Sequence, residues 1–304
     1  MSDPEAGETS RWRVIAGDGL LAPLYGVRMD RAPTEEITHP AWADDEWFAE
    51  RARLAAVQSR RPGALGSHST AALLHGIPLP TYARRRRSPV HVVSPEGSAV
   101  RLRGVQGHRG RIVEQPVEVG GVSVCGALQT LVQLAPMLTE RDLIIAVEGL
   151  MGPWHGPAIS PDAVAAAAVR HAGARGLVRL RSALSRARPG VGSPQESELR
   201  LDLVELGFPE PTVGSRIWVE SMQRHLSPDL LYDQIATVIE YEGEHHRTDR
   251  DQYTFDIRRM NAFRSVGYYV ERVVAGAPVV DLIMVLHDRF RQLARGAFVP
   301  PRPA

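Results

Sequence analysis

The segment from Ser227 to Gly243 constrains the fold of this chain more than any other part of the sequence. A turn at Pro228-Asp229 is followed by an apolar run that ends in Glu240 and Glu242. Successive side chains of a strand point to opposite faces, so this run predicts a buried strand that carries both glutamates on one side. If the chain folds back as a hairpin, Asp229 joins them there.

Carboxylates gathered on one side of a sheet repel each other unless a cation neutralises them. Mg²⁺ and Mn²⁺ prefer oxygen ligands, and such ions promote phosphodiester hydrolysis by binding a phosphate oxygen and lowering the pKa of water. We therefore expect Asp229 and Glu240 to hold the metal, with Glu242 as a further ligand or a group that positions water. His245 or His246 would act as general acid or base. The alternative is that these acids are only solvated residues at a strand end.

Composition narrows the classes of function. The formal net charge of the 304 residues is only +1, so nucleic-acid binding has to come from local basic patches. All 36 Lys+Arg residues are arginine, which excludes mechanisms that need a lysine nucleophile. The single cysteine, Cys125, excludes an intramolecular disulfide, and its apolar neighbours suggest burial. A polar N-terminus, and apolar runs that stay short of the ~20 residues of a membrane span, indicate a cytoplasmic protein without a membrane partner.

Turn signals and periodicity divide the chain into three regions. Residues 1–152 are expected to form an α+β, winged-helix-like region, residues 153–192 a helical connector, and residues 193–297 an α/β domain. In the last region the order helix, strand, strand, helix, strand, helix is typical of an α/β sandwich. The strands expected at 235–241 and 268–273 are joined by a helix, so they should run parallel.

Local signals in residues 1–192 predict short elements. Gly120-Gly121 is a hairpin signal between two strands. Ser67 to Thr70 should cap a short helix that ends at Gly76, and we interpret His68, Ser69 and His75 as cap and core residues rather than a catalytic set. The expected helices cover 44–60, 71–75, 127–134, 139–151, 161–171 and 175–187, and the expected strands cover 89–93, 105–108, 117–119 and 122–124.

Five ordered motifs lie in the third region. They are Ser193-Pro194-x-Glu196-Ser197-x-Leu199-Arg200, Pro228-Asp229-Leu230, Ile239-Glu240-Tyr241-Glu242-Gly243-x-x-His246, Asp256-x-x-Arg259-x-Asn261 and Gly267-Tyr268. In order and spacing they resemble the DUF559 domain of the Vsr-like branch of the PD-(D/E)xK endonuclease superfamily. The resemblance covers residues 193–296 and implies a restriction-endonuclease-like fold, a mixed sheet flanked by helices.

The resemblance also implies roles for single residues. Asp229 and Glu240 match the metal-binding acids of the family, Glu196 matches the acid of the opening helix, and His246 matches the histidine after the glycine. The chain departs from the pattern at Glu242, which occupies the place of the superfamily's lysine and stands where the DUF559 pattern usually has an aspartate. Glu242 is one methylene longer, which alters the geometry available to a metal.

The N-terminal half is similar to the AbiEi-type antitoxin module. The similarity lies in Leu20-Leu21, Tyr25-Gly26-Val27, the segment Ser67-His68-Ser69-Thr70-Ala71-Ala72-x-x-His75-Gly76-Ile77-Pro78, His91-Val92 and Gly107-His108-Arg109-Gly110. It implies a winged-helix and sheet arrangement associated with DNA binding. It also adds a toxin, or a second copy of this chain, to the partners considered beside DNA.

Arginines gather in two places where they could meet a phosphate backbone. Arginine suits bidentate phosphate contact. The alternatives are solvated charge runs and, for Arg259, an ion pair with Asp256 or another acid. The residues assigned to DNA contact are Arg84, Arg85, Arg86, Arg87, Arg109, Arg247 and Arg259.

These observations predict a DNA-binding protein whose C-terminal domain is a metal-dependent endonuclease. The alternatives are a non-catalytic antitoxin or transcriptional regulator, which uses a nuclease-like fold only to bind DNA, and a plain interaction protein. The positions of two carboxylates distinguish the endonuclease from these alternatives. If those of Asp229 and Glu240 lie within ~5 Å in an open cleft, one cation can bridge them, whereas arginines over them indicate a structural role.

Overall fold

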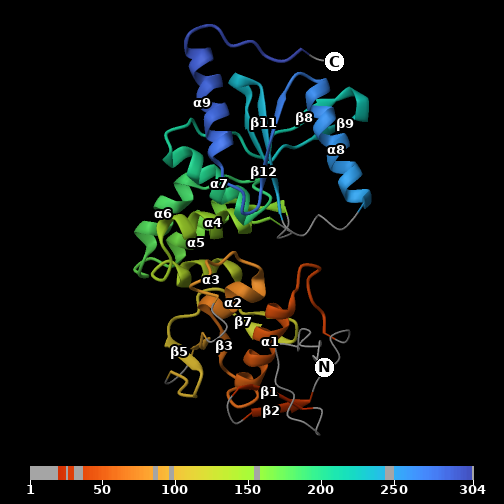
Figure 1. Ribbon diagram of the computed structural model, residues 1–304. Helices are drawn as coiled ribbons and strands as arrows, with labels where there is room; N and C mark the ends of the chain where they lie inside the picture. Colours follow the sequence, from red (N-terminus) through yellow and green to blue (C-terminus); the bar gives the residue numbers. More distant parts are fainter. Residues whose placement is uncertain are drawn as a thin grey trace, which may run out of the picture. The chain divides into compact units, whose positions relative to one another are not determined.

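The computed structural model describes residues 20–24, 27–30, 37–84, 88–95, 99–153, 158–243 and 250–302. The chain forms two compact units (Figure 1). The first contains the described residues up to Val147 together with Pro161–Arg186, and the second contains Glu148–Ser160 and the described residues from Ala187 onward. Helices and mixed sheets in both units confirm the expected α/β class. Among the described residues, no helix has the length and apolar character needed to span a membrane.

The first unit contains a five-stranded mixed sheet with the order β5-β4-β3-β7-β6. A separate antiparallel pair, β1 and β2, precedes it. The strands are β1 (Leu20–Leu24), β2 (Val27–Asp30), β3 (Leu65–Gly66), β4 (Val90–Ser94), β5 (Val105–Arg109), β6 (Val117–Val119) and β7 (Val122–Val124). The expected hairpin is confirmed, because Gly120 (φ 59°) and Gly121 (φ 75°) form the two-residue turn between β6 and β7.

Both faces of strand β4 are buried. Val90 and Val92 lie in one apolar cluster with Trp47 and Leu54, whereas Val93 lies in another that contains Cys125. Alternate residues of a strand point to opposite faces, so the two clusters lie on opposite sides of the sheet. The expected burial of Cys125 is confirmed, and burial raises its pKa to about 11.

The helices of the first unit follow their local signals. Asp44 caps the first helix by accepting a hydrogen bond of 2.8 Å from the Trp47 backbone N–H. The second helix ends at Gly76 as expected, but it begins at His68, three residues earlier than the sequence indicated. The helices are α1 (Asp45–Gln58), α2 (His68–His75), α3 (Ala127–Leu134), α4 (Glu140–Met151, which continues into the second unit), α5 (Pro161–Arg170) and α6 (Leu177–Arg186).

The second unit contains a three-stranded sheet, β10-β11-β12, and a separate antiparallel pair, β8 and β9. The predicted central strand is β11, and its predicted parallel pairing with β12 is confirmed. The elements are α7 (Pro194–Glu205), β8 (Ile217–Val219), β9 (Arg224–Leu226), β10 (Leu230–Tyr232), β11 (Thr237–Glu242), α8 (Arg250–Ser265), β12 (Tyr269–Val274) and α9 (Val280–Ala294).

Strand β11 is apolar because it is buried on both faces. Ile239 lies in a cluster with Leu286 of α9, and Val238 lies in a cluster with Phe263 of α8. The two helices therefore cover opposite faces of the sheet (Figure 1). Glu240 points to the same face as Val238, so its carboxylate is directed toward α8.

A buried ion pair joins α4 to α7 within the second unit. Arg200 is 1% exposed and donates to Glu148, which is 0% exposed, at 2.5 Å. Glu148 also accepts from the Arg188 backbone N–H at 2.8 Å, and Arg200 reaches Glu210 as well. Burial raises the pKa of Glu148, with Arg200 opposing the shift, so this carboxylate depends on its arginine to stay charged.

Candidate functional site

The strand register brings Asp229 and Glu240 together. Leu230 pairs with Ile239 in the antiparallel pairing of β10 with β11, so Asp229, immediately before β10, lies opposite Glu240. An Oδ2 atom of Asp229 accepts a hydrogen bond of 2.7 Å from the Tyr241 backbone N–H. The fold-back that the sequence left conditional therefore occurs, with its turn at Asp233–Ile235 between β10 and β11, and it places the two acids side by side at one end of the sheet.

Arg259 of α8 contacts both of these acids. Its Nη1 lies 2.8 Å from Oε2 of Glu240, and its Nη2 lies 3.9 Å from Oδ1 of Asp229. The same guanidinium donates a hydrogen bond to the Ser227 carbonyl oxygen. Arg259 lies one helical turn before Phe263, which packs on β11, so the helix directs the arginine to the same face as Glu240.

Glu196 is a third acid near this pair, and it also caps α7. Its Oε1 accepts from the Ser193 hydroxyl at 2.9 Å, its backbone N–H donates to the Ser193 Oγ at 3.2 Å, and its Oε2 accepts from the Gly192 N–H at 2.8 Å. Ser193 thus caps the helix as in a Ser-x-x-Glu capping box, but the Glu196 carboxylate reaches the N–H of Gly192 rather than that of Ser193. Both carboxylate oxygens of Glu196 are therefore engaged locally.

The electrostatics show that the three acids act on one another. Burial, and next the Asp229 carboxylate, raise the pKa of Glu240 to about 8, with Arg259 opposing. Burial and Asp229 likewise raise the pKa of Glu196 to about 7. Burial raises the pKa of Asp229, against the Tyr241 N–H and Arg259. Among the described residues Arg259 is the arginine that opposes these shifts, and its single charge does not hold three neighbouring carboxylates ionised.

Glu240 has one carboxylate oxygen that no residue in the described part of the chain satisfies. Its Oε1 is buried and has no hydrogen-bond partner among the described residues, while Oε2 is held by Arg259. A buried carboxylate oxygen without a partner is costly unless something binds it. Oε1 of Glu240 is therefore the candidate ligand atom among the three acids.

Glu242 is engaged elsewhere. It forms a two-pronged ion pair with Arg272 of β12, with the Nε to Oε1 distance at 2.5 Å. Glu240 and Glu242 were predicted to share one face of the strand. Arg272 lies opposite Glu240 in the parallel register, so it lies on that face and can reach Glu242 diagonally. Glu242 thus pairs with Arg272, whereas Glu240 shares Arg259 with Asp229.

Several candidate residues lie outside the part of the chain that the structure describes. They are His245, His246, Arg247, Arg85, Arg86 and Arg87. Of the other arginines assigned to DNA, Arg84 pairs with Glu46 at 2.5 Å, and Arg109 is exposed at the end of β5. Arg259 is the assigned DNA contact that lies at the acids.

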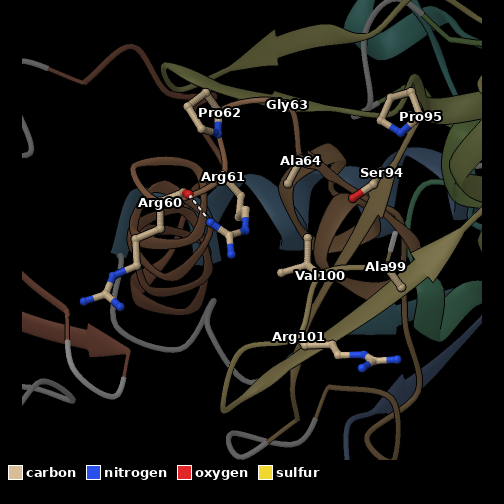
Figure 2. A pocket seen from close by; sticks show the side chains of 10 residues that line it. All are labelled: Arg60, Arg61, Pro62, Gly63, Ala64, Ser94, Pro95, Ala99, Val100 and Arg101. Carbon is tan, nitrogen blue, oxygen red and sulfur yellow. Dashed lines mark hydrogen bonds between the residues drawn. The ribbon is translucent and has the colours of Figure 1, made fainter. Parts of the chain in front are cut away.

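A basic pocket lies in the first unit, between the end of α1 and the segment that joins β4 to β5. Its volume is about 800 Å³, and Arg60, Arg61 and Arg101 line it (Figure 2). The Arg61 Nη1 donates to the Arg60 carbonyl oxygen at 3.0 Å. None of its described lining residues is acidic, so the pocket is suited to an anion such as a phosphate.

Sequence reasoning missed one cluster in the first unit. His68, His91 and His108 bring three potential ligand atoms within 4.8 Å of one another, and no other such group of His, Cys, Asp or Glu occurs in the described ranges. The interpretation of His68 as a helix cap did not foresee these partners. The signal is weak in the sequence because the three residues are far apart: the β4–β5 pairing joins His91 and His108, and α2 brings His68 to them.

Comparison with known proteins identified no relative of this chain. No family model, curated protein or solved structure matches the chain. The resemblances to the DUF559 domain and to the AbiEi-type module therefore rest on the sequence motifs alone.

Proposed function

We propose that the second unit is a restriction-endonuclease-like domain that hydrolyses phosphodiester bonds of DNA with Mg²⁺ or Mn²⁺. The observation that carries the proposal is the convergence of Asp229, Glu240 and Glu196, whose charges repel one another, together with a buried oxygen of Glu240 that has no partner among the described residues. A divalent cation would relieve both conditions. The order α7, β10, β11, α8, β12 supports the resemblance to the DUF559 domain.

Two of the acids fit such a cation. Oε1 of Glu240 is available, and the closest arginine contact of Asp229 Oδ1 is at 3.9 Å, beyond hydrogen-bond range. Glu196 fits less well, because both of its oxygens accept local hydrogen bonds. When bound, the metal would polarise the scissile phosphate and lower the pKa of a water molecule.

The chain's own groups would bind the substrate and move protons. The Tyr241 N–H fixes Asp229, and Arg259, once released from Glu240, can form a bidentate contact with a phosphate. Glu196, with its pKa near 7, can exchange a proton at neutral pH. His246 remains a second candidate for that role.

The first unit would contribute to DNA binding in this proposal. Its motifs are similar to the AbiEi-type module, and Arg60, Arg61 and Arg101 surround the pocket of about 800 Å³. Arg109 lies exposed at the end of the neighbouring strand β5. A phosphate backbone is the polyanion that such arginines suit, and its binding should weaken steeply with salt.

A non-catalytic DNA-binding regulator is the second candidate function. The contacts of Arg259 with Asp229 and Glu240 favour it, because an arginine over these two acids is the arrangement expected of a structural site and can balance a buried carboxylate without a metal. Glu242 in place of the superfamily's lysine points the same way. In this case the nuclease-like unit only binds DNA, and a toxin or a second copy of the chain is its further partner.

A cleavage assay with matched variants tests the proposal. Single- and double-stranded DNA is incubated with the whole chain and Mg²⁺ or Mn²⁺, beside Glu240→Gln, Asp229→Asn and Glu198→Gln. We expect cleavage by the wild type and by Glu198→Gln, whose side chain is exposed on α7, and none by the other two. Glu240→Gln keeps the shape of the side chain and removes a buried charge, so its loss of activity would not come from unfolding.

The outcomes separate the two candidates. If the wild type cleaves nothing but binds DNA, the regulator is favoured. If Glu240→Gln cleaves as well as the wild type, the site assignment is wrong whatever the reaction. Arg259→Gln adds a measurement without turnover: in the nuclease it should bind Mn²⁺ more tightly, because the competing guanidinium is gone, and in the regulator Mn²⁺ binding stays absent.

A further inference from the structure

Three histidines of the first unit meet at one point of its fold. His91 of β4 and His108 of β5 lie on neighbouring parallel strands, where His91 pairs with Gln106 and Val93 with His108. His91 and His108 therefore point to the same face of the sheet. His68 begins α2, which packs against β4, and its ring stacks on that of His108 with centroids 3.7 Å apart.

We propose that His68, His91 and His108 form a binding site for a borderline divalent transition ion such as Zn²⁺. Their potential ligand atoms all lie within 4.8 Å of one another, and imidazole nitrogen is a preferred zinc ligand. Among the described residues no fourth His, Cys, Asp or Glu joins the group. The fourth position of a tetrahedral ion is thus left to water or an added ligand, as in zinc sites with three protein ligands.

The present distances are close to those that zinc requires. Nδ1 of His91 lies 2.9 Å from Nε2 of His108, whereas tetrahedral zinc with bonds of ~2.05 Å separates its ligand nitrogens by about 3.3 Å. A small separation of the two rings replaces their hydrogen bond with two metal bonds. The His68 ring, now inclined only 19° to that of His108, has to rotate, because a metal lies in the plane of the imidazole that binds it.

The surroundings orient the ligands. The Ser67 hydroxyl lies 3.0 Å from Nδ1 of His68, which leaves Nε2 for the metal, and the amide oxygen of Gln133 accepts from the His68 backbone N–H at 3.1 Å. The Thr70 hydroxyl accepts from the His91 backbone N–H at 2.9 Å. Such outer contacts hold metal ligands in place.

The backbone of His68 favours a ligand, and the ionisation state of the histidines is compatible with one. His68 has φ 49°, a left-handed conformation that is uncommon for a residue with a side chain and that tends to occur at functional positions. Burial, and next the neighbouring histidines, lower the pKa of His68 to about 3, and burial lowers that of His91 to about 4, so both rings are neutral at physiological pH. Neutral imidazole is the form that binds a metal.

Cobalt and zinc titrations of the whole chain, stripped with a chelator, test the site. We expect one equivalent of Co²⁺ to give the intense visible absorption of tetrahedral coordination and Zn²⁺ to displace it. His108→Gln, at the more exposed position, and His68→Asn, since asparagine tolerates positive φ, should each weaken binding by about 100-fold. His225→Gln, at an exposed position of the second unit, should leave binding unchanged.

Other results would overturn the site. Absence of stoichiometric binding at micromolar ion refutes it, and so does a Co²⁺ spectrum that both histidine variants leave intact. Circular dichroism of each variant establishes that it is folded, and if one variant fails to fold, the other decides the question. DNA cleavage by the second unit does not enter this measurement, so the two proposals can fail separately.

Discussion

Nη1 of Arg259 lies 2.8 Å from Oε2 of Glu240, inside a group of carboxylates that this one guanidinium cannot neutralise. The pKa of Glu240 is raised to about 8 in spite of the contact, because burial and Asp229 outweigh the arginine. Arg259 therefore neutralises these carboxylates incompletely, and a divalent cation would neutralise them further. The dependence of the free energy of unfolding on pH can test this incomplete neutralisation without any assumption about catalysis.

Arg259→Gln should destabilise the protein mainly at high pH. The variant leaves Asp229 and Glu240 without their countercharge, which should lower the free energy of unfolding by about 1–3 kcal/mol at pH 8.5. At pH 5 the carboxyl of Glu240 is protonated and the loss should be smaller. Urea unfolding at both pH values measures this. Arg258→Gln, which alters an exposed neighbour on α8, is the control and should change stability by less than ~0.5 kcal/mol.

Glu240→Gln should stabilise the protein as the pH rises. The pKa of Glu240 is raised from an ordinary value of 4.5 to about 8 on folding. Its contribution to stability is therefore complete below pH 4.5 and is lost as the pH rises toward 8. The variant should match the wild type at pH 4 and exceed it by about 1–3 kcal/mol at pH 9. A variant that is less stable than the wild type at pH 9 would show that the Arg259 ion pair outweighs burial.

Acid should destabilise the first unit through its histidines. The pKa values of His68 and His91 fall on folding from 6.5 to about 3 and about 4, with Arg53 adding to the effect on His91. The unfolded chain takes up protons first, so the free energy of unfolding declines from pH 6.5 down to these values. His68→Asn should flatten this decline by at most about 1.4 kcal/mol per pH unit, as read by urea unfolding in metal-free buffer. His225→Gln should not flatten it.

Breaking the Arg200–Glu148 pair should be among the costliest single changes in the second unit. Arg200→Met leaves a fully buried carboxylate uncompensated and should lower the free energy of unfolding by about 3–5 kcal/mol. The double variant Arg200→Met/Glu148→Leu removes both charges and should recover most of that loss. A double-mutant cycle measures the coupling, and additive effects of the two single variants would show that the pair is not coupled.

Local signals predicted most of the helices and strands. Gly120-Gly121 determined the β6–β7 hairpin, because two consecutive residues with positive φ are required there and glycine meets that need. The apolar run that ends at Glu240 identified the central strand, and the helix that follows it implied the parallel pairing with β12. These predictions succeeded because they depend on neighbours in the sequence and on the handedness of the chain.

The contacts between side chains were harder to predict from the sequence. An ion pair of Arg259 with a nearby acid was one interpretation of the sequence. The sequence did not predict that Arg259 would contact both Asp229 and Glu240. The helix start at His68 was placed too late, because Ser67 to Thr70 looked like a cap. The pairing of Glu242 with Arg272 also depends on the register between β11 and β12, which periodicity alone does not specify.

The sequence by itself determined the α/β class, the hairpin at Gly120-Gly121 and the central strand that carries Glu240 and Glu242, since strand alternation and turn chemistry are local properties. Only the tertiary structure decided which charges meet. It placed Arg259 against Glu240, buried Arg200 against Glu148, and brought His68 to His91 and His108. Such encounters follow from how helices and strands pack, and packing is settled by the whole core rather than by the residues that meet.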